Sequence, residues 1–197
     1  SENYEGDLPH GLSKEDERVY LLSKKAMESI STTESQQGIL AKIAIPKREM
    51  PDGDFYLILE DIQDPGNLGT IFRTAEAAGI SHIFMNKTCT DIFSPKAVRS
   101  TMGSLFRVSF SIHEDLESIC KMLKKQAVRI YAMHLSGENV FYQENFRFPS
   151  AFMLGNEGNG LSESLTKLSD QLIRIPMLGQ IESLNVATTA SILMYEV

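Results

Sequence analysis

The chain has 197 residues, 42% of them hydrophobic, and carries 26 acidic against 19 basic side chains for a formal net charge of -7. This length suffices for one well-buried domain with a small appendage. No apolar run in the sequence reaches the roughly 18 to 20 residues that cross a bilayer, and two distant cysteines without histidines at ligand spacing indicate neither a zinc site nor a disulfide framework. We therefore expect a cytoplasmic protein with no membrane and no metal partner, and no broad nucleic-acid-binding surface.

The N-terminal quarter predicts a leader followed by short elements. Residues 1–12 lack periodicity and favour a flexible leader. Ser13 is placed to cap a helix over 14–30. Residues 38–45 alternate partly and end at a proline, which is typical of a strand.

A domain junction is expected at residues 46–54. This stretch combines two prolines, a glycine and several charges, so we predict domains over 1–50 and 51–197. Because the chain lacks an initiator methionine and stops within a helical pattern, we also expect it to be a fragment of a longer protein.

From residue 51 onward, short apolar runs alternate with amphipathic ones. Alternation of this kind predicts an α/β fold, a parallel sheet flanked by helices on both faces. The expected strands are 55–59, 82–85, 105–110, 129–134, 151–154 and 172–175. The expected helices are 67–79, 95–102, 114–126, 161–169 and 184–197.

The first candidate site segment is residues 64–69, which join a strand to a helix. Asn67 is a natural helix cap, and the glycines beside it allow a ligand close to the backbone. A helix N-terminus also suits a phosphate group. Arg73 lies off the apolar stripe and is predicted to reach a cleft at the strand ends; the alternative is a pair with Glu76.

The second segment, residues 154–160, carries three glycines and two asparagines in seven positions. Such a loop exposes backbone donors and acceptors, but it matches neither the dinucleotide-binding glycine motif nor a phosphate loop. Glu157 supplies a carboxylate for substrate hydroxyls or for a cationic partner, unless it is merely a solvated loop residue.

The third segment, residues 175–187, follows a strand and leads into the last helix. Ser183 is the expected cap of that helix, and Asn185 in its first turn could point at a cofactor or a reacting hydroxyl. Taken alone, this pattern is more typical of an ordinary capped core helix.

Together and in this order, the three segments resemble the SpoU-type (TrmH-like) RNA 2′-O-ribose methyltransferases of the SPOUT superfamily, over roughly residues 55–197. The resemblance implies a C-terminal deep trefoil knot, an exception to the rule that chains do not knot. It implies S-adenosylmethionine as methyl donor, S-adenosylhomocysteine as product, and a homodimer that acts on tRNA or rRNA. It also implies that the run 33–41 is the tail of a small α/β RNA-recognition domain similar to ribosomal protein L30e.

The same resemblance assigns residues to roles. Arg73 would orient the reacting ribose-phosphate or lower the pKa of its hydroxyl, and Asn67 would contact phosphate or ribose. The implied catalytic residues are Arg73, Asn67, Glu157, Ser183 and Asn185. The implied cofactor-binding residues are His134, Leu135, Leu154, Gly155, Asn156, Glu157, Ile175, Pro176, Met177, Ser183, Leu184, Asn185 and Ala187.

Ribose methylation needs a positioned hydroxyl and a departing proton rather than a protein nucleophile or a metal, and the sequence shows neither a nucleophile triad nor a metal cluster. One alternative is a non-catalytic RNA-binding dimeric scaffold with the same fold, against which the presence of Arg73, Glu157, Ser183 and Asn185 counts. The second alternative is a methyltransferase that acts on guanine N1. An acidic RNA enzyme also needs a local basic patch, for which the candidates are Lys47, Arg48, Arg73, Lys87, Lys96 and Arg99, although each could be a solvated surface charge.

Overall fold

The structure, a computed structural model, describes residues 4, 6, 8, 10–31, 37–45 and 52–196. The chain divides into two compact units, Ser1–Lys47 and Arg48–Val197. In the described part of the first unit, helix α1 (Lys24–Ile30) begins after Ser23, whose side chain accepts a hydrogen bond from the Ala26 N–H at 3.3 Å.

Two expectations for the first unit are wrong. The helix expected over 14–30 begins only at Lys24, because Ser23 and not Ser13 provides its cap. No strand forms within the described stretch 37–45, where four large apolar side chains are 41–62% exposed. A strand needs a hydrogen-bonded neighbour and a buried face, and the alternating pattern alone supplies neither. Part of the run 33–41, together with Lys47 and Arg48, lies outside the described residues.

The second unit is a seven-stranded parallel sheet in the order β3-β2-β1-β6-β4-β7-β5. Its strands are β1 (Phe55–Leu59), β2 (His82–Asn86), β3 (Phe110–His113), β4 (Arg129–Met133), β5 (Asn139–Val140), β6 (Ser150–Leu154) and β7 (Gln171–Arg174). Its helices are α2 (Pro65–Ala77), α3 (Pro95–Ser100), α4 (Leu116–Lys125), α5 (Glu163–Leu168) and α6 (Val186–Glu196), with short 3-10 turns η1 (Ser104–Phe106) and η2 (Phe141–Gln143).

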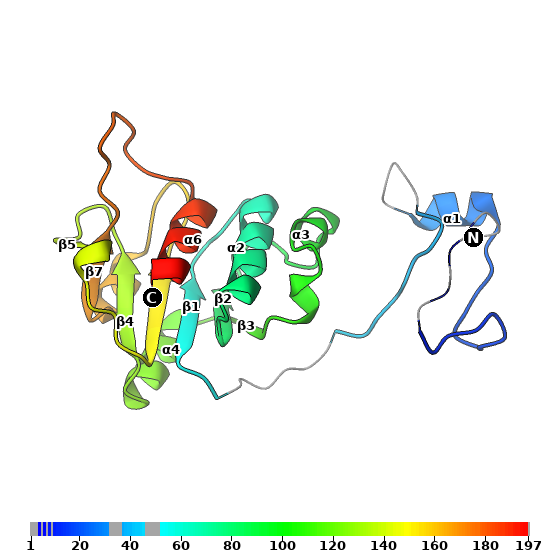
Figure 1. Cartoon of the computed structure of the whole chain (residues 1–197), viewed down its shortest axis with the longest axis horizontal. Coiled ribbons are helices and arrows are strands. Elements are labelled where there is room, and N and C mark those ends of the chain that lie inside the picture. Colours follow the sequence, from blue (N-terminus) through cyan, green and yellow to red (C-terminus); the bar gives the residue numbers. More distant parts are fainter. Residues whose placement is uncertain are drawn as a thin grey trace. The chain divides into compact units, whose positions relative to one another are not determined.

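Helices cover both faces of this sheet, which confirms the α/β prediction. Helices α2, α3 and α6 lie side by side on one face, with α2 in the middle (Figure 1). Their apolar sides form one core cluster with the sheet, and α4 and α5 form a second cluster on the opposite face. The central strands β1 and β6 are buried along their whole length, as expected for a parallel sheet covered on both sides.

The strand expected over 105–110 is misplaced. Residues 104–106 form η1, and β3 starts at Phe110. A tight turn precedes η1: Met102 and Gly103 both have positive φ, at 51° and 87°, and the buried Ser104 hydroxyl donates to the Thr101 carbonyl at 2.8 Å. The apolar residues that were expected to form a strand lie in η1 and the residues after it, and most of them pack into the core from there. The sequence also gave no signal for the two-residue edge strand β5.

Strand β1 lies at the point where the chain changes direction across the sheet. The chain runs from β1 to β2 and β3 on one side, and then returns so that β6 pairs with the other side of β1. The Glu60 N–H donates to the Leu154 carbonyl at 2.9 Å, beyond the last residue of β1. The loops that follow β1 and β6 are therefore adjacent at the carboxyl edge of the sheet, where α/β proteins bind ligands.

Helices α2 and α3 approach each other backbone to backbone. A Cβ atom added to Gly69 would lie 2.3 Å from the Ser100 Cβ and 3.0 Å from the Ala97 carbonyl oxygen. Only glycine fits at this contact, so the two helices form a rigid pair on the sheet.

The buried imidazole of His82 connects β2 to β3. His82 is 1% exposed, and its two ring nitrogens hydrogen-bond with the Ser109 and Ser111 hydroxyls at 2.9 and 2.8 Å. Burial, and secondarily the nearby His113, lowers the pKa of His82 from 6.5 to about 4.

We predict that this histidine makes the fold acid-sensitive. Between pH 6.5 and about 4 the unfolded chain binds a proton at His82 and the folded chain does not, so the stability from the neutral ring is full above pH 6.5 and is lost as the pH falls. The loss amounts to about 3 kcal/mol. Urea unfolding of wild type and His82→Gln at several pH values measures it. The variant should be less stable at pH 7 but less sensitive to acid; equal pH dependence in the two proteins would contradict the prediction.

Candidate functional site

Three loops at the carboxyl edge of the sheet carry the candidate residues. They follow β1 (residues 60–64), β6 (155–162) and β7 (175–185). In Figure 1 the orange-brown segment that leads from β7 to α6 rises beyond the carboxyl ends of β4 and β7. The strand order brings these loops together although they are far apart in the sequence.

The Glu157 carboxylate joins the β6 loop to the start of α2. It accepts hydrogen bonds from the backbone N–H groups of Gln63 at 3.2 Å and Asp64 at 3.3 Å. A third hydrogen bond comes from the Asn67 side-chain amide at 3.1 Å. Glu157 is therefore more than a solvated loop residue: one carboxylate receives three donors from the segment that opens α2.

Asn67 also contacts the third segment. Its side-chain oxygen accepts a hydrogen bond from the Asn185 side-chain amide at 2.9 Å. The chain of contacts Glu157–Asn67–Asn185 thus ties together all three segments found in the sequence. We call these three side chains the carboxylate–amide relay.

The expected caps of the two flanking helices are wrong. Helix α2 begins at Pro65, and its cap is Asp64, whose side chain accepts from the Asn67 N–H at 2.8 Å. Helix α6 begins at Val186, and the Asn185 side-chain oxygen, not Ser183, accepts from the N–H groups at its start, Ala187 at 2.9 Å among them. The Asn67 side chain does not cap a helix, so it can hydrogen-bond with Glu157 and Asn185 instead.

The relay keeps Glu157 ionised. Partial burial alone would raise the pKa of this carboxyl, but the hydrogen bonds from the Asn67 side chain and from the backbone outweigh burial and lower the pKa below its usual value. A carboxylate with a lowered pKa is a weak base. Glu157 is therefore suited to holding donors in place and poorly suited to taking a proton from a weakly acidic hydroxyl.

The glycine-rich loop after β6 is a rigid turn. Asn156 and Gly160 exchange two backbone hydrogen bonds at 3.0 and 2.9 Å, and the Asn156 side chain accepts from the Gly158 and Asn159 N–H groups. A Cβ atom on Gly155 would lie 2.2 Å from the Gly160 carbonyl carbon. The loop therefore needs glycine at position 155 in order to close.

Asp61 links this loop to the rest of the edge, a contribution that the sequence analysis missed. Its φ of 56° is in the left-handed region, and its carbonyl accepts from the side-chain amides of Asn156 at 2.9 Å and Gln63 at 3.2 Å. Its carboxylate accepts from Asn86 at 2.7 Å and from the Thr88 hydroxyl. Left-handed backbone outside glycine is uncommon and tends to persist where surrounding contacts require it.

The residues expected to bind the cofactor follow three adjacent strands, β6, β4 and β7. Leu154 and Ala187 are buried, whereas Ile175, Pro176, Met177 and Leu184 are partly buried. The His134 N–H donates to the Ile173 carbonyl at 3.0 Å, which joins the ends of β4 and β7, and the His134 ring hydrogen-bonds with the Ser136 hydroxyl at 2.7 Å. The side chain of Leu135 is 70% exposed.

The structure does not bring Arg73 and Ser183 into the relay. Arg73 is six residues beyond Asn67, about 9 Å further along α2. Its side chain is exposed and has no hydrogen bond or ion pair with any described residue; Glu76 pairs instead with Arg107. Ser183 is likewise exposed, with no hydrogen bond among the described residues.

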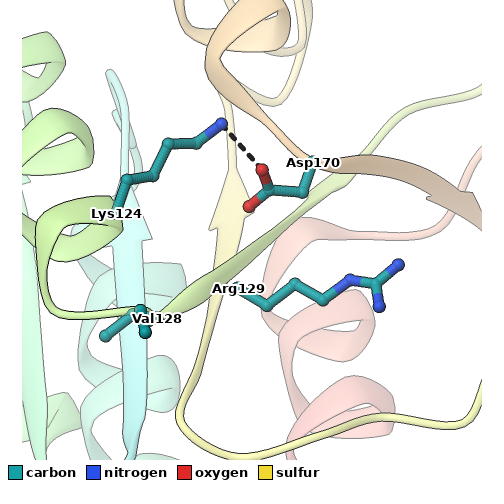
Figure 2. Close-up of a pocket in the computed structure, with 5 residues that line it drawn as sticks. Lys124, Val128, Arg129 and Asp170 are labelled. Atoms are coloured by element: carbon teal, nitrogen blue, oxygen red, sulfur yellow. Dashed lines mark ion pairs between the residues drawn. The ribbon is translucent and has the colours of Figure 1, made fainter.

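A hollow of about 440 Å³ lies at the opposite edge of the sheet. Figure 2 shows its lining, which comes from the end of α4 and the starts of β4 and β7; the residues are Lys124, Ala127, Val128, Arg129 and Asp170. The Lys124 amine pairs with Asp170 at 2.8 Å, and the Arg129 guanidinium donates to Gln171 at 2.7 Å. Its charged groups already have partners, so we do not assign the candidate site to this hollow.

Among the described residues, no helix is both long and apolar enough to cross a membrane. The same residues contain no group of three or more histidine, cysteine or acidic side chains that could hold a metal ion.

A glycine-rich turn and an amide-bearing helix start lie where the chain changes direction across a parallel sheet, which defines an α/β protein with a candidate ligand site at its carboxyl edge. Comparison with known proteins identifies the family. The SpoU rRNA Methylase family matches residues 54–195, and the chain belongs to it.

Three similar proteins illustrate the relationship. The chain is 36% identical over 179 residues to the 23S rRNA (guanosine(2553)-2'-O)-methyltransferase RlmP of Bacillus subtilis, covering 90% of this chain and 71% of that protein. A TrmH-family structure from Porphyromonas gingivalis, described as a putative RNA methyltransferase, has a TM-score of 0.76 at 29% identity, covering 90% and 72%. The AdoMet-bound rRNA methyltransferase from Sinorhizobium meliloti has a TM-score of 0.75 at 32% identity, covering 88% and 69%.

We predict that the left-handed backbone and the carboxylate of Asp61 both support the edge. Asp61→Asn keeps an acceptor and tolerates positive φ, Asp61→Gly keeps only the backbone freedom, and Asp61→Ala keeps neither. Destabilisation should rise in that order, reaching about 2–4 kcal/mol for alanine. Urea unfolding measures this order, and hydrogen exchange of residues 154–162 should accelerate in parallel. If Asp61→Gly and Asp61→Ala lost the same free energy of unfolding, the left-handed backbone conformation at this position would carry no energetic cost.

Proposed function

We infer that this chain is an S-adenosylmethionine-dependent RNA methyltransferase that methylates a ribose 2′-hydroxyl in rRNA or tRNA. The observation that carries this inference is the carboxylate–amide relay, which joins the three segments at the carboxyl edge of a SpoU-family sheet. The names of the relatives support it, since the Bacillus subtilis relative is a 2'-O-methyltransferase and the Sinorhizobium meliloti structure contains AdoMet. Both favour an enzyme over a non-catalytic scaffold.

The residues at the ends of β6, β4 and β7 fit the cofactor chemically. The strand ends and Gly155 offer backbone N–H and C=O groups to an adenine edge. The partly buried Met177, Pro176 and Leu184 offer apolar contact to its ring. We propose that this set, with His134, Leu135, Ile175 and Ala187, holds S-adenosylmethionine.

In the proposed reaction the bound cofactor supplies an electrophilic methyl group. The chain's own residues position the hydroxyl within roughly 3 to 3.5 Å of that methyl and ease the departure of its proton. The relay fixes the Asn67 and Asn185 amides, which can hydrogen-bond ribose or phosphate oxygens, and Ser183 adds a hydroxyl near the same turn. Arg73 contacts the reacting ribose-phosphate and acts electrostatically, because an arginine is a poor base.

The finer organisation is also a proposal. We propose that the C-terminal stretch threads through a preceding loop to form a deep trefoil knot and that the enzyme is a homodimer. Helix α6 packs on α2, and the Thr74 and Ser191 hydroxyls are hydrogen-bonded at 3.2 Å. This packing of the last helix is consistent with the proposed knot. Leu178 is 99% and Ile181 60% exposed, so the β7–α6 loop offers apolar contact to a second copy.

Residues 1–50 we assign to the tail of an RNA-recognition domain, and 51–197 to the catalytic domain. A cytoplasmic location follows from the proposed RNA substrates.

We predict micromolar binding of S-adenosylmethionine and S-adenosylhomocysteine in calorimetric titrations of the chain. Gly155→Val should abolish binding, because its side chain would collide with the Gly160 backbone. Gly158→Ala is the matched control: its Cβ would come no closer than 3.5 Å to the Asn156 side chain, so affinity should stay within about twofold. Unchanged affinity in Gly155→Val would move the pocket elsewhere, and no binding by the folded wild type would favour the scaffold.

We predict that Arg73→Ala lowers methyl transfer to unmodified rRNA about 100-fold or more, because the developing charge on the ribose oxygen loses its stabilising cation. Cofactor affinity should stay within about twofold, since Arg73 lies away from the cofactor residues. Transfer of a radiolabelled methyl group measures the first effect and calorimetry the second. Lys125→Ala, which removes an exposed cation from α4, should leave both unchanged. Turnover within a few-fold of wild type in Arg73→Ala would remove the arginine from the mechanism.

A further inference from the structure

We propose that the outer surface of α2, α3 and η1 binds a single-stranded RNA segment next to the target nucleotide, with Met102 contacting a base and Arg99 a phosphate. This RNA-facing surface consists of Arg73, Arg99, Met102 and Phe106. The proposal rests on the proposed function and adds to it the face by which the RNA approaches and the residues that contact it.

The surface carries local positive charge on an acidic chain. Residues 64–77 and 95–107 contain four basic and two acidic side chains, against a net charge of -7 for the whole chain. Both acids are paired, Asp64 with Lys96 at 3.2 Å and Glu76 with Arg107. Arg73 and Arg99 are exposed and have no hydrogen-bonding or ionic side-chain partner among the described residues. Uncompensated cations of this kind are what phosphate groups require.

The two arginines emerge on the same side. Helices α2 and α3 lie next to each other (Figure 1) and touch where Gly69 meets Ser100. Arg73 is one helical turn beyond Gly69, and Arg99 directly precedes Ser100. Both arginines are exposed, whereas their neighbours Phe72 and Ala97 are buried in one core cluster, so both guanidinium groups lie on the outer surface of the helix pair.

Met102 is held in solvent by a rigid turn. Its side chain is 70% exposed although its φ is 51°, a conformation that costs energy for a residue other than glycine. The turn is firmly built: Thr101 and Ser104 are fully buried, and the Ser104 N–H and hydroxyl both donate to the Thr101 carbonyl, at 3.0 and 2.8 Å. The next large apolar side chain, Phe106, is 48% exposed. The protein thus presents apolar contact area here at a conformational cost.

Guanidinium groups beside exposed apolar side chains suit an unstacked RNA strand. Its phosphates would pair with arginines, and its base faces would stack on apolar or aromatic side chains. Methionine is polarisable and makes favourable contacts with aromatic rings. A protein partner would instead leave two arginines to be neutralised or desolvated. Charge complementarity therefore favours RNA as the occupant.

The test compares three single variants with wild type in fluorescence anisotropy, using a labelled 12-nucleotide single-stranded RNA of mixed sequence between 50 and 200 mM salt. Arg99→Gln should weaken binding about fivefold or more and lower the salt slope by about 0.7. Met102→Asn, which tolerates positive φ, should weaken binding about five- to thirtyfold with the salt slope unchanged. Met102→Leu should restore most of that affinity. The matched control Lys125→Gln removes an exposed cation from the opposite face and should change neither quantity.

Equal effects of Arg99→Gln and Lys125→Gln, wild-type affinity in Met102→Asn, or no binding of this RNA by wild type would each overturn the proposal. A lower sedimentation coefficient for Met102→Asn would also overturn it, because the surface would then be a contact between subunits. Calorimetry with S-adenosylmethionine on the same preparations separates this proposal from the proposed function. Intact cofactor binding with unchanged RNA affinity would reject only the RNA-facing surface, and failed cofactor binding in wild type would reject the enzyme.

Discussion

The Glu157 carboxylate is the constraint on which the candidate site depends. A parallel sheet brings the loops after β1 and β6 to one edge but does not fix their distance. The Gln63 and Asp64 N–H groups lie just before Pro65, the first residue of α2, and both donate to the β6 loop. One carboxylate satisfies two backbone donors there and holds the Asn67 amide as a third. Without this acceptor, the Asn67 side chain would have no fixed direction toward Asn185.

Two uncommon backbone features let that carboxylate reach its partners. Gly155 allows the β6 loop to fold back onto Gly160, and the Glu157 carboxylate in this loop reaches the Gln63 and Asp64 N–H groups across the edge. The left-handed Asp61 turns the β1 loop so that its carbonyl meets the Asn156 amide. Each feature lowers the conformational freedom of a loop before any ligand arrives. Binding then requires less ordering, which is the benefit of a preorganised site.

The sheet was predictable from the sequence, whereas the exact contacts were not. Apolar runs such as 55–59 and 151–154 are too short for typical helices and are bounded by polar or turn residues, which favours strands buried on both faces. The caps needed finer signals. Pro65 favours the first helical position and so indicated Asp64 as the cap, a signal that the glycines and Asn67 obscured. Asp61 gave no pattern at all, because its conformation is imposed by Asn86, Thr88 and Asn156, which are distant in sequence. The strand expected at 105–110 failed for a different reason: local hydrogen bonds from Ser104 to the Thr101 carbonyl build a turn and η1 where the apolar run suggested a strand.

The distribution of charge connects the fold to its substrate. An acidic protein repels RNA over most of its surface, and the Debye length of about 8 to 10 Å at physiological salt confines any attraction to the immediate surroundings of a cation. Attraction is then limited to places where arginines lack acidic partners. Arg73 meets this condition on the helix whose first turn carries Asn67, and Arg99 meets it on the helix packed against that one. Repulsion elsewhere thus acts together with local attraction, and an RNA strand is directed to the side of the molecule where the relay lies at the head of α2.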